Sequence, residues 1–139
     1  MGFLSKFIGR KDEQDFQLIE SEMVKLKRKV NAEMIVIFGI GGRLKGLPLI
    51  YASDDDSEVK QFSARLYEVI VPLDKVSVDR NLRDFVINYS DSLLFFKQIM
   101  ENIGYFAIFG NKNDLLVIKQ WIYKKEEVLK NLLHEKKLY

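Results

Sequence analysis

The hydrophobic and polar positions of this chain follow two periods, one typical of helices and the other of strands. Over residues 13–31, apolar residues recur at spacings of three and four, and charged side chains fill most positions between them. These apolar residues are Phe16, Ile19, Met23, Leu26 and Val30. The pattern predicts an amphipathic helix, whose acidic first turn and basic last turns complement the helix dipole.

Two short apolar runs follow this helix and predict a pair of strands. Residues 34–38 and 47–52 are rich in β-branched and aromatic side chains. The glycine-rich segment between them suits a hairpin connection that contains residues at positive φ. Pro48 cannot donate a hydrogen bond to a neighbouring strand, so we expect the second strand to begin there or to lie at a sheet edge.

The same glycine-rich segment also invites comparison with phosphate-binding loops. A dinucleotide-binding fingerprint that begins at Gly39 would need glycine or alanine where the chain has Leu44. A P-loop would need serine or threonine directly after its lysine, but Gly46 follows Lys45. Both motifs open a helix, whereas a proline and a β-branched residue follow here. The context therefore favours a hairpin turn.

A second helix is predicted after the polar run at residues 53–58, which supplies capping residues and acids for a first turn. The apolar residues at helical spacing are Val59, Phe62, Leu66, either Val69 or Ile70, and Leu73. Pro72 places the predicted end near residues 69–71. The acidic run Asp54–Asp56 lacks calcium-binding spacing, and acids at a helix start are expected from the dipole, so we interpret it as a cap.

Three more β-like runs occupy residues 84–89, 93–100 and 105–109, with polar or glycine-containing turns between them. Short turns of this kind join antiparallel strands. Adjacent residues of a strand point to opposite faces, so one of Phe95 and Phe96 is expected in the core, while the other covers a helix layer or meets a partner. A last helix begins at Asn113 or Asp114 and extends to about Lys136.

The element order is therefore α-β-β-α-β-β-β-α. It predicts an α+β fold in which helices cover the faces of a five-stranded antiparallel sheet. We expect residues 13–139 to form a single domain, preceded by an N-terminal segment over residues 1–12.

Composition narrows the chemistry. Among 139 residues there is no cysteine, which excludes thiol catalysis. The single histidine, His134, argues against a catalytic dyad that contains histidine. We therefore expect a binding protein rather than an enzyme, with no catalytic residue, cofactor or metal site. Basic residues concentrate at both ends around a mildly acidic body, which argues against nucleic-acid binding. Because the chain has no membrane-spanning or secretory apolar run, we expect a cytoplasmic protein.

The N-terminal segment has a cationic amphipathic pattern. Its apolar residues fall on one helical face beside basic ones, an arrangement suited to weak, reversible contact with an anionic lipid surface at the inner face of the membrane. The residues expected to make this contact are Phe3, Leu4, Lys6, Phe7, Ile8, Arg10 and Lys11. The alternatives are that the segment folds back onto the core or docks on a partner.

The element order and one local pattern resemble the roadblock family, which includes roadblock-type dynein light chains, bacterial polarity-GTPase regulators and small archaeal proteins. Members commonly carry glycine, an apolar residue, proline and an apolar residue at the start of the second strand, as in Gly46-Leu47-Pro48-Leu49. The resemblance covers residues 13–136 and indicates a prokaryotic, archaeal member. The chain departs from the pattern in a longer connection at residues 41–45. Longin or SNARE-like proteins share these layers but typically begin with a strand.

This resemblance implies a homodimer in which the central helices pack together and the third strands pair edge to edge. It also implies binding to a Ras-like small GTPase, as a scaffold, a recruiting platform or an activator. The residues expected at the dimer or partner interface are Gln61, Arg65 and Glu68 on the helix and Phe85, Val86 and Ile87 on the strand. The alternatives are a longin-like or SNARE-like trafficking adaptor and a small-molecule sensor.

Overall fold

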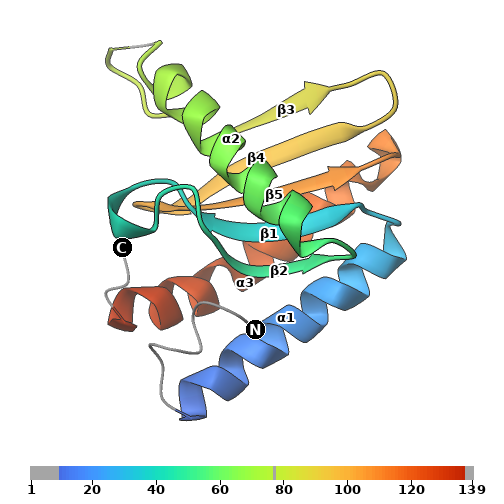
Figure 1. The fold of residues 1–139 in the computed structure, drawn as a ribbon, viewed down its shortest axis with the longest axis vertical. Coiled ribbons are helices and arrows are strands. Elements are labelled where there is room, and N and C mark those ends of the chain that lie inside the picture. The colour runs from blue at the N-terminus through green and yellow to red at the C-terminus, as the bar shows by residue number, and fades with distance from the viewer. Residues whose placement is uncertain (1–9, 77, 137–139) are drawn as a thin grey trace.

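The computed structural model describes residues 10–76 and 78–136, and within these ranges the side chains of residues 13–76 and 78–133. Three helices and five strands follow the expected order (Figure 1). They are α1 (Arg10–Lys29), β1 (Met34–Gly39), β2 (Pro48–Ser53), α2 (Asp56–Asp74), β3 (Asp84–Asn88), β4 (Leu93–Met100), β5 (Ile103–Phe109) and α3 (Leu115–Lys136). Two 3-10 turns, η2 (Gly42–Leu44) and η3 (Lys112–Asp114), precede β2 and α3.

The strands form one sheet in the order β2-β1-β5-β4-β3, and every neighbouring pair is antiparallel. The predicted α+β fold with five antiparallel strands is therefore confirmed. In this order β2 and β3 are the two edge strands. Pro48 is the first residue of β2, so both expectations for this proline hold, since the strand begins there and lies at an edge.

Helices cover both faces of the sheet. Helix α2 lies across one face over β1 and β2, while α1 and α3 pack on the other (Figure 1). Side chains of β4 alternate between the two cores, with Phe96 under α2 and Phe95 under the α1 and α3 layer. Both are buried because helices cover each face, so the second residue of this pair covers a helix layer.

The predicted end of α2 is wrong. The helix continues through Pro72 to Asp74 instead of ending at residues 69–71. A proline removes only one hydrogen-bond donor, and the carbonyl of Pro72 still accepts from the N–H of Lys75 at 3.1 Å. Leu73, the last of the apolar residues at helical spacing, is 40% exposed. At the alternative position, Ile70 is buried and Val69 is 46% exposed.

Other boundaries shift by two or three residues. Helix α1 begins at Arg10 rather than residue 13, so the expected division between residues 12 and 13 falls inside this helix. It ends at Lys29, and Asn31 adopts a positive φ of 49° shortly after it. Strand β5 begins at Ile103 rather than residue 105, because Asn102 adopts a φ of 68° and closes a two-residue turn.

The connection between β1 and β2 is a hairpin, as the sequence predicts. Gly42 and Gly46 have φ values of 63° and 75°, which favour glycine at these positions. At Gly39, a Cβ atom would overlap the carbonyl oxygen of Leu44. The glycines therefore serve chain reversal and close backbone contact, and a strand rather than a helix follows them.

The acidic run before α2 provides the expected cap. The carboxylate of Asp55 accepts hydrogen bonds from the Ser57 hydroxyl at 2.8 Å, the Ser57 N–H at 2.9 Å and the Glu58 N–H at 3.3 Å. These bonds lower the pKa of Asp55, and the bond from the Ser57 hydroxyl has the largest effect.

Among the helices that the structure describes, none is long and apolar enough to cross a membrane.

Candidate protein–protein interface

The three α2 residues expected at an interface lie on the outer side of the helix. Gln61, Arg65 and Glu68 are all exposed. They follow one another at spacings of four and three and therefore share one side of α2. The buried side consists of Val59, Ser63, Leu66 and Ile70. The structure thus brings the three polar residues together, turned away from the sheet.

The three β3 residues are half-buried on an edge strand. Phe85 and Ile87 pack against the core under α2, and Val86 packs against the core on the opposite face. The ring of Phe85 stacks on that of Phe96, with centroids 5.0 Å apart and planes inclined by 25°. Each of these side chains is therefore covered on the side toward β4 and exposed on the side toward the sheet edge.

The outer backbone edge of β3 presents hydrogen-bonding groups to a further strand. Tyr89 N–H donates to the Ser92 carbonyl, and Gln98 N–H donates to the Arg83 carbonyl, each at 2.8 Å. Because such bonds alternate along an antiparallel pair, the backbone groups of Asp84, Val86 and Asn88 point away from β4. Among the described residues, no strand pairs with this edge.

An apolar flank of α2 was missed by the sequence analysis. Val69 and Leu73 are 46% and 40% exposed, and they lie seven and eleven positions after Phe62, hence on the same flank of the helix. Phe62 stacks on Phe106 of β5, with ring centroids 5.4 Å apart. The flank therefore lies on the side of α2 toward β5, β4 and β3.

The remaining expected site residues are those of the expected lipid contact. Phe3, Leu4, Lys6, Phe7 and Ile8 lie outside the described residues. Arg10 and Lys11 are in the first turn of α1, in the part of the chain whose side chains the structure does not describe.

Surface hollows also occur away from this surface, and polar side chains make up much of their lining. One, of about 560 Å³, lies near the C-terminal end of β4 and is lined by Asp74, Asn81, Arg83, Lys97, Gln98, Ile99, Met100, Glu101, Glu126 and Lys130. At its floor the ammonium group of the buried Lys97 lies 3.2 Å from the Glu126 carboxylate. This ion pair ties α3 to β4, which is a structural role.

Comparisons with known proteins agree with this architecture. No protein-family model matches the chain, and no match was found among curated proteins. A solved roadblock/LC7 domain from Streptomyces avermitilis is similar, with a TM-score of 0.71 and 14% identity over 83% of this chain and 97% of that domain. MglB from Myxococcus xanthus is similar with a TM-score of 0.70 and 14% identity, over 86% and 98% of the two chains.

A further similar structure is MglB in a tetrameric arrangement, with a TM-score of 0.67 and 12% identity over 93% of this chain and 94% of that one. At these identities the comparisons show the fold. The structural neighbours of the chain are thus roadblock/LC7 domain proteins, as the element order and the motif Gly46-Leu47-Pro48-Leu49 indicate.

Proposed function

We propose that the chain is a homodimeric, non-catalytic binding module that regulates a Ras-like small GTPase. The observation that carries the proposed dimer is the open edge of β3 together with the apolar flank of α2, formed by Phe62, Val69 and Leu73, on the face of the sheet to which Phe85 and Ile87 of β3 also point. An open edge strand is an aggregation hazard unless it is covered or paired. A second copy related by two-fold symmetry offers the same edge, so the unpaired backbone groups of each β3 can bind those of the other.

The register of β3 fixes how two copies would pair. Since Asp84, Val86 and Asn88 carry the outward backbone groups, a two-fold axis at Val86 places this residue opposite its own counterpart. The same axis places Asp84 of one copy opposite Asn88 of the other, which pairs a carboxylate with an amide rather than two like charges. The two sheets would then continue into one.

The apolar flank of α2 adds a hydrophobic contribution to the same interface. Packing two α2 helices beside the joined strands would remove Val69 and Leu73 from water, and full burial of such a side chain stabilises by about 1.5–3 kcal/mol. Both residues are already about half-buried, so each would contribute roughly half of that range. A stable interface of standard size, about 1,200–2,000 Å² in total, needs such an apolar centre.

Binding to a Ras-like GTPase is proposed from the roadblock resemblance, which the shared fold supports. In the proposed dimer, Gln61, Arg65 and Glu68 remain on the outer sides of the paired α2 helices, where they form a polar surface with both signs of charge. The lack of cysteine and the single histidine support a role in scaffolding, recruitment or ordering of the GTPase's own site. Helix α1 precedes the first strand, which favours this role over a longin-like adaptor.

The test is binding of purified Ras-like GTPases from the source cell, each loaded with GDP or with a non-hydrolysable GTP analogue. We expect one of them to bind in a nucleotide-dependent way, and Arg65→Glu to weaken this binding at least about tenfold, as for an arginine at an interface hot spot. Lys124→Glu, the same charge change on the exposed face of α3, is the matched control. Failure of every GTPase to bind in both nucleotide states would contradict the proposal, as would equal effects of the two variants.

A further inference from the structure

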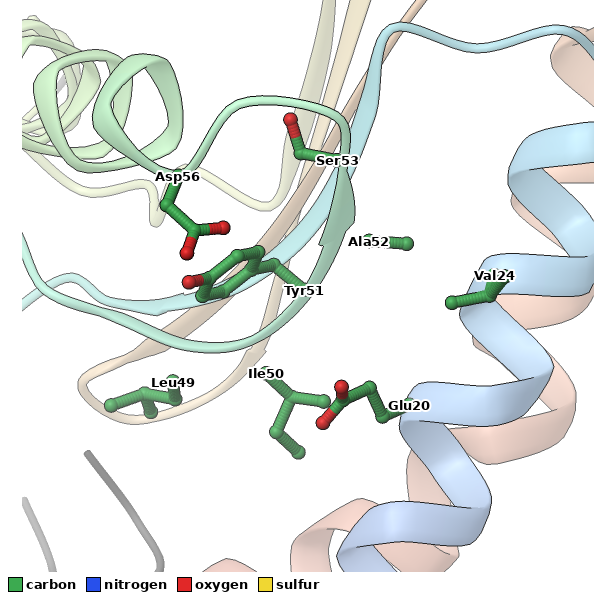
Figure 2. A pocket seen from close by; sticks show the side chains of 8 residues that line it. All are labelled: Glu20, Val24, Leu49, Ile50, Tyr51, Ala52, Ser53 and Asp56. Atoms are coloured by element: carbon green, nitrogen blue, oxygen red, sulfur yellow. The ribbon is translucent and has the colours of Figure 1, made fainter. Parts of the chain in front are cut away.

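The two flanks of helix α1 differ in charge. On the flank toward β2, a hollow of about 440 Å³ is lined by Glu20 and Val24 of α1, by residues of β2 and by Asp56 of α2 (Figure 2). Among the described residues that line it, the charged ones are two carboxylates. On the flank toward α3, a hollow of about 320 Å³ is lined by residues of α1 and α3, and most of its charged lining is basic. This second hollow lies on the face of the sheet opposite α2.

The second hollow is part of a groove that runs along both helices. The Lys125 ammonium group of α3 lies 2.7 Å from the Glu22 carboxylate of α1. Leu26 comes after Glu22 in α1, whereas Trp121 comes before Lys125 in α3, and both line the hollow. Helices α1 and α3 therefore run antiparallel, as Figure 1 also shows. The hollow is thus continuous with the seam between them, the α1–α3 groove.

The floor of the α1–α3 groove is apolar and ordered. It consists of Leu26, which is buried, and of Val117 and Trp121, which are half-buried. The Trp121 ring stacks on that of Tyr105 beneath it, with centroids 5.9 Å apart and planes inclined by 26°. Because this contact already holds the indole in place, a partner that covers it loses little side-chain entropy. Tryptophan is also among the residues that contribute most at protein interfaces.

Exposed apolar side chains extend this floor beyond the ion pair. Leu18 lies one turn before Glu22 on α1, and Val128 lies seven positions after Trp121 on α3, so each shares the groove flank of its helix. They are 62% and 47% exposed. The antiparallel order places both at the same end of the groove. Between Leu18 and Lys29 the α1 wall spans roughly 17 Å, about three helical turns.

The rims of the α1–α3 groove are basic. Lys25 and Lys29 of α1 and Lys124 of α3 line it and are exposed. Among the described residues, no carboxylate pairs with any of these three ammonium groups. The acidic lining residue, Glu22, is already neutralised by Lys125. The groove therefore presents an apolar floor between uncompensated positive charges.

We propose that the α1–α3 groove binds an amphipathic helix of a partner protein, with acidic side chains on both sides of an apolar stripe. The stripe would cover the floor, and the acids would reach Lys25 and Lys29 on one rim and Lys124 on the other. A helix fits better than an extended segment, because the backbone groups of the helical walls are bonded within each helix and offer an extended chain nothing to pair with.

The same geometry favours a protein partner over a membrane. The lysines stand at the exposed rims, while Leu26 is buried at the floor. A side chain that projects from a bound helix can reach this floor, whereas a lipid surface, which is flat on this scale, would meet the rims first. The groove lies on the face opposite α2 and away from the β3 edge, so the proposal does not rest on the dimer or on GTPase binding.

The test uses the fluorescence of Trp121, the only tryptophan of the full chain. The probe is a tryptophan-free synthetic helix of about four turns, with a leucine stripe between two rows of glutamates. We expect a saturable shift of the Trp121 emission to shorter wavelength as the indole leaves water. A peptide with the same leucine stripe between two rows of lysines is the control and should bind at least about tenfold more weakly.

Charge reversal tests the rims. Lys25→Glu combined with Lys29→Glu should weaken binding of the glutamate peptide at least about tenfold and strengthen binding of the lysine peptide. Both positions are exposed, so the fold should be retained. Lys60→Glu combined with Lys75→Glu makes the same charge change at exposed positions outside the groove and should leave both affinities unchanged.

Four results would overturn the proposal. They are an unchanged Trp121 emission with the glutamate peptide, equal binding of the two peptides, and equal effects of the two double variants. The fourth is a shift that appears without peptide, either as the protein concentration rises or on phosphatidylserine vesicles. A shift with protein concentration would assign the groove to a second copy of the chain, and one on vesicles would assign it to lipid.

Discussion

Phe85 on the edge strand β3 stacks on Phe96 of β4, with ring centroids 5.0 Å apart and planes inclined by 25°. This contact seats the outermost strand on the sheet, because Phe96 is buried under α2 while Phe85 stays half-exposed. We expect Phe85→Ala to lower the free energy of unfolding by about 1–2 kcal/mol, through the lost stacking and the lost burial. Urea unfolding at fixed protein concentration measures it, with Tyr89→Ala as the control. If the two variants lowered the free energy of unfolding equally, the stabilising role of the contact between Phe85 and Phe96 would be contradicted.

The apolar flank of α2 predicts a change of assembly without a change of fold. Leu73→Glu combined with Val69→Glu places charges at side chains that are 40% and 46% exposed, so the folded chain tolerates them, whereas a dimer that buries them does not. Sedimentation velocity should show a shift to monomer. Leu116→Glu, on α3 and 62% exposed, should leave the assembly unchanged. A dimer in the double variant would exclude this flank from the interface.

The ion pair between Lys97 and Glu126 predicts strong coupling. Their side chains are only 10% and 20% exposed. Lys97→Met leaves a partly buried carboxylate without its cation and should cost about 1–3 kcal/mol of unfolding free energy. Adding Glu126→Gln should recover most of the loss, because neither charge then remains. The control is Asp54→Ala, whose side chain is 93% exposed in its pair with Lys27 and which should change stability by less than about 0.5 kcal/mol. A double variant no more stable than Lys97→Met would be inconsistent with this coupling.

The cap of α2 predicts a pH dependence. Hydrogen bonds to the carboxylate lower the pKa of Asp55 in the folded protein. Its contribution to stability is therefore fully present above the unfolded pKa of about 4 and is lost as the pH falls through the lower folded pKa. Asp55→Ala should lower the melting temperature at pH 7, and Asp55→Asn, which still caps, should lower it less. The gap between the native chain and Asp55→Asn should shrink in acid. A gap that is constant from pH 7 to pH 3 would contradict this account.

The fold was predictable because most elements carry their own local signals. Glycines with positive φ mark the hairpin after β1, and alternate burial explains why Phe95 and Phe96 are both apolar. The α2 end was not predictable from Pro72 alone, because the cost of a proline depends on whether the last turn satisfies its other carbonyls.

The candidate interface was predictable only in part. Gln61, Arg65 and Glu68 follow from the helical period, since they lie opposite the buried residues of α2. The exposed flank at Val69 and Leu73 depends on where α2 crosses the sheet, which is a tertiary property. The same holds for the outward backbone groups of Val86, which depend on the register between β3 and β4. Side-chain alternation gives the face of the sheet to which each residue points, and turn geometry takes part in setting the pairing of the strands.

The most direct test of the proposed dimer is the molar mass of the native chain and of Val86→Pro by light scattering. Proline removes the outward N–H of residue 86, and the bonds between β3 and β4 use the residues on either side, so the monomer should still fold. Val86→Thr keeps the N–H and is the control. We predict twice the 16.3 kDa of one chain for the native protein and for Val86→Thr, and the mass of one folded chain for Val86→Pro. A monomeric native protein, or a Val86→Pro variant that remains a dimer, would contradict the account.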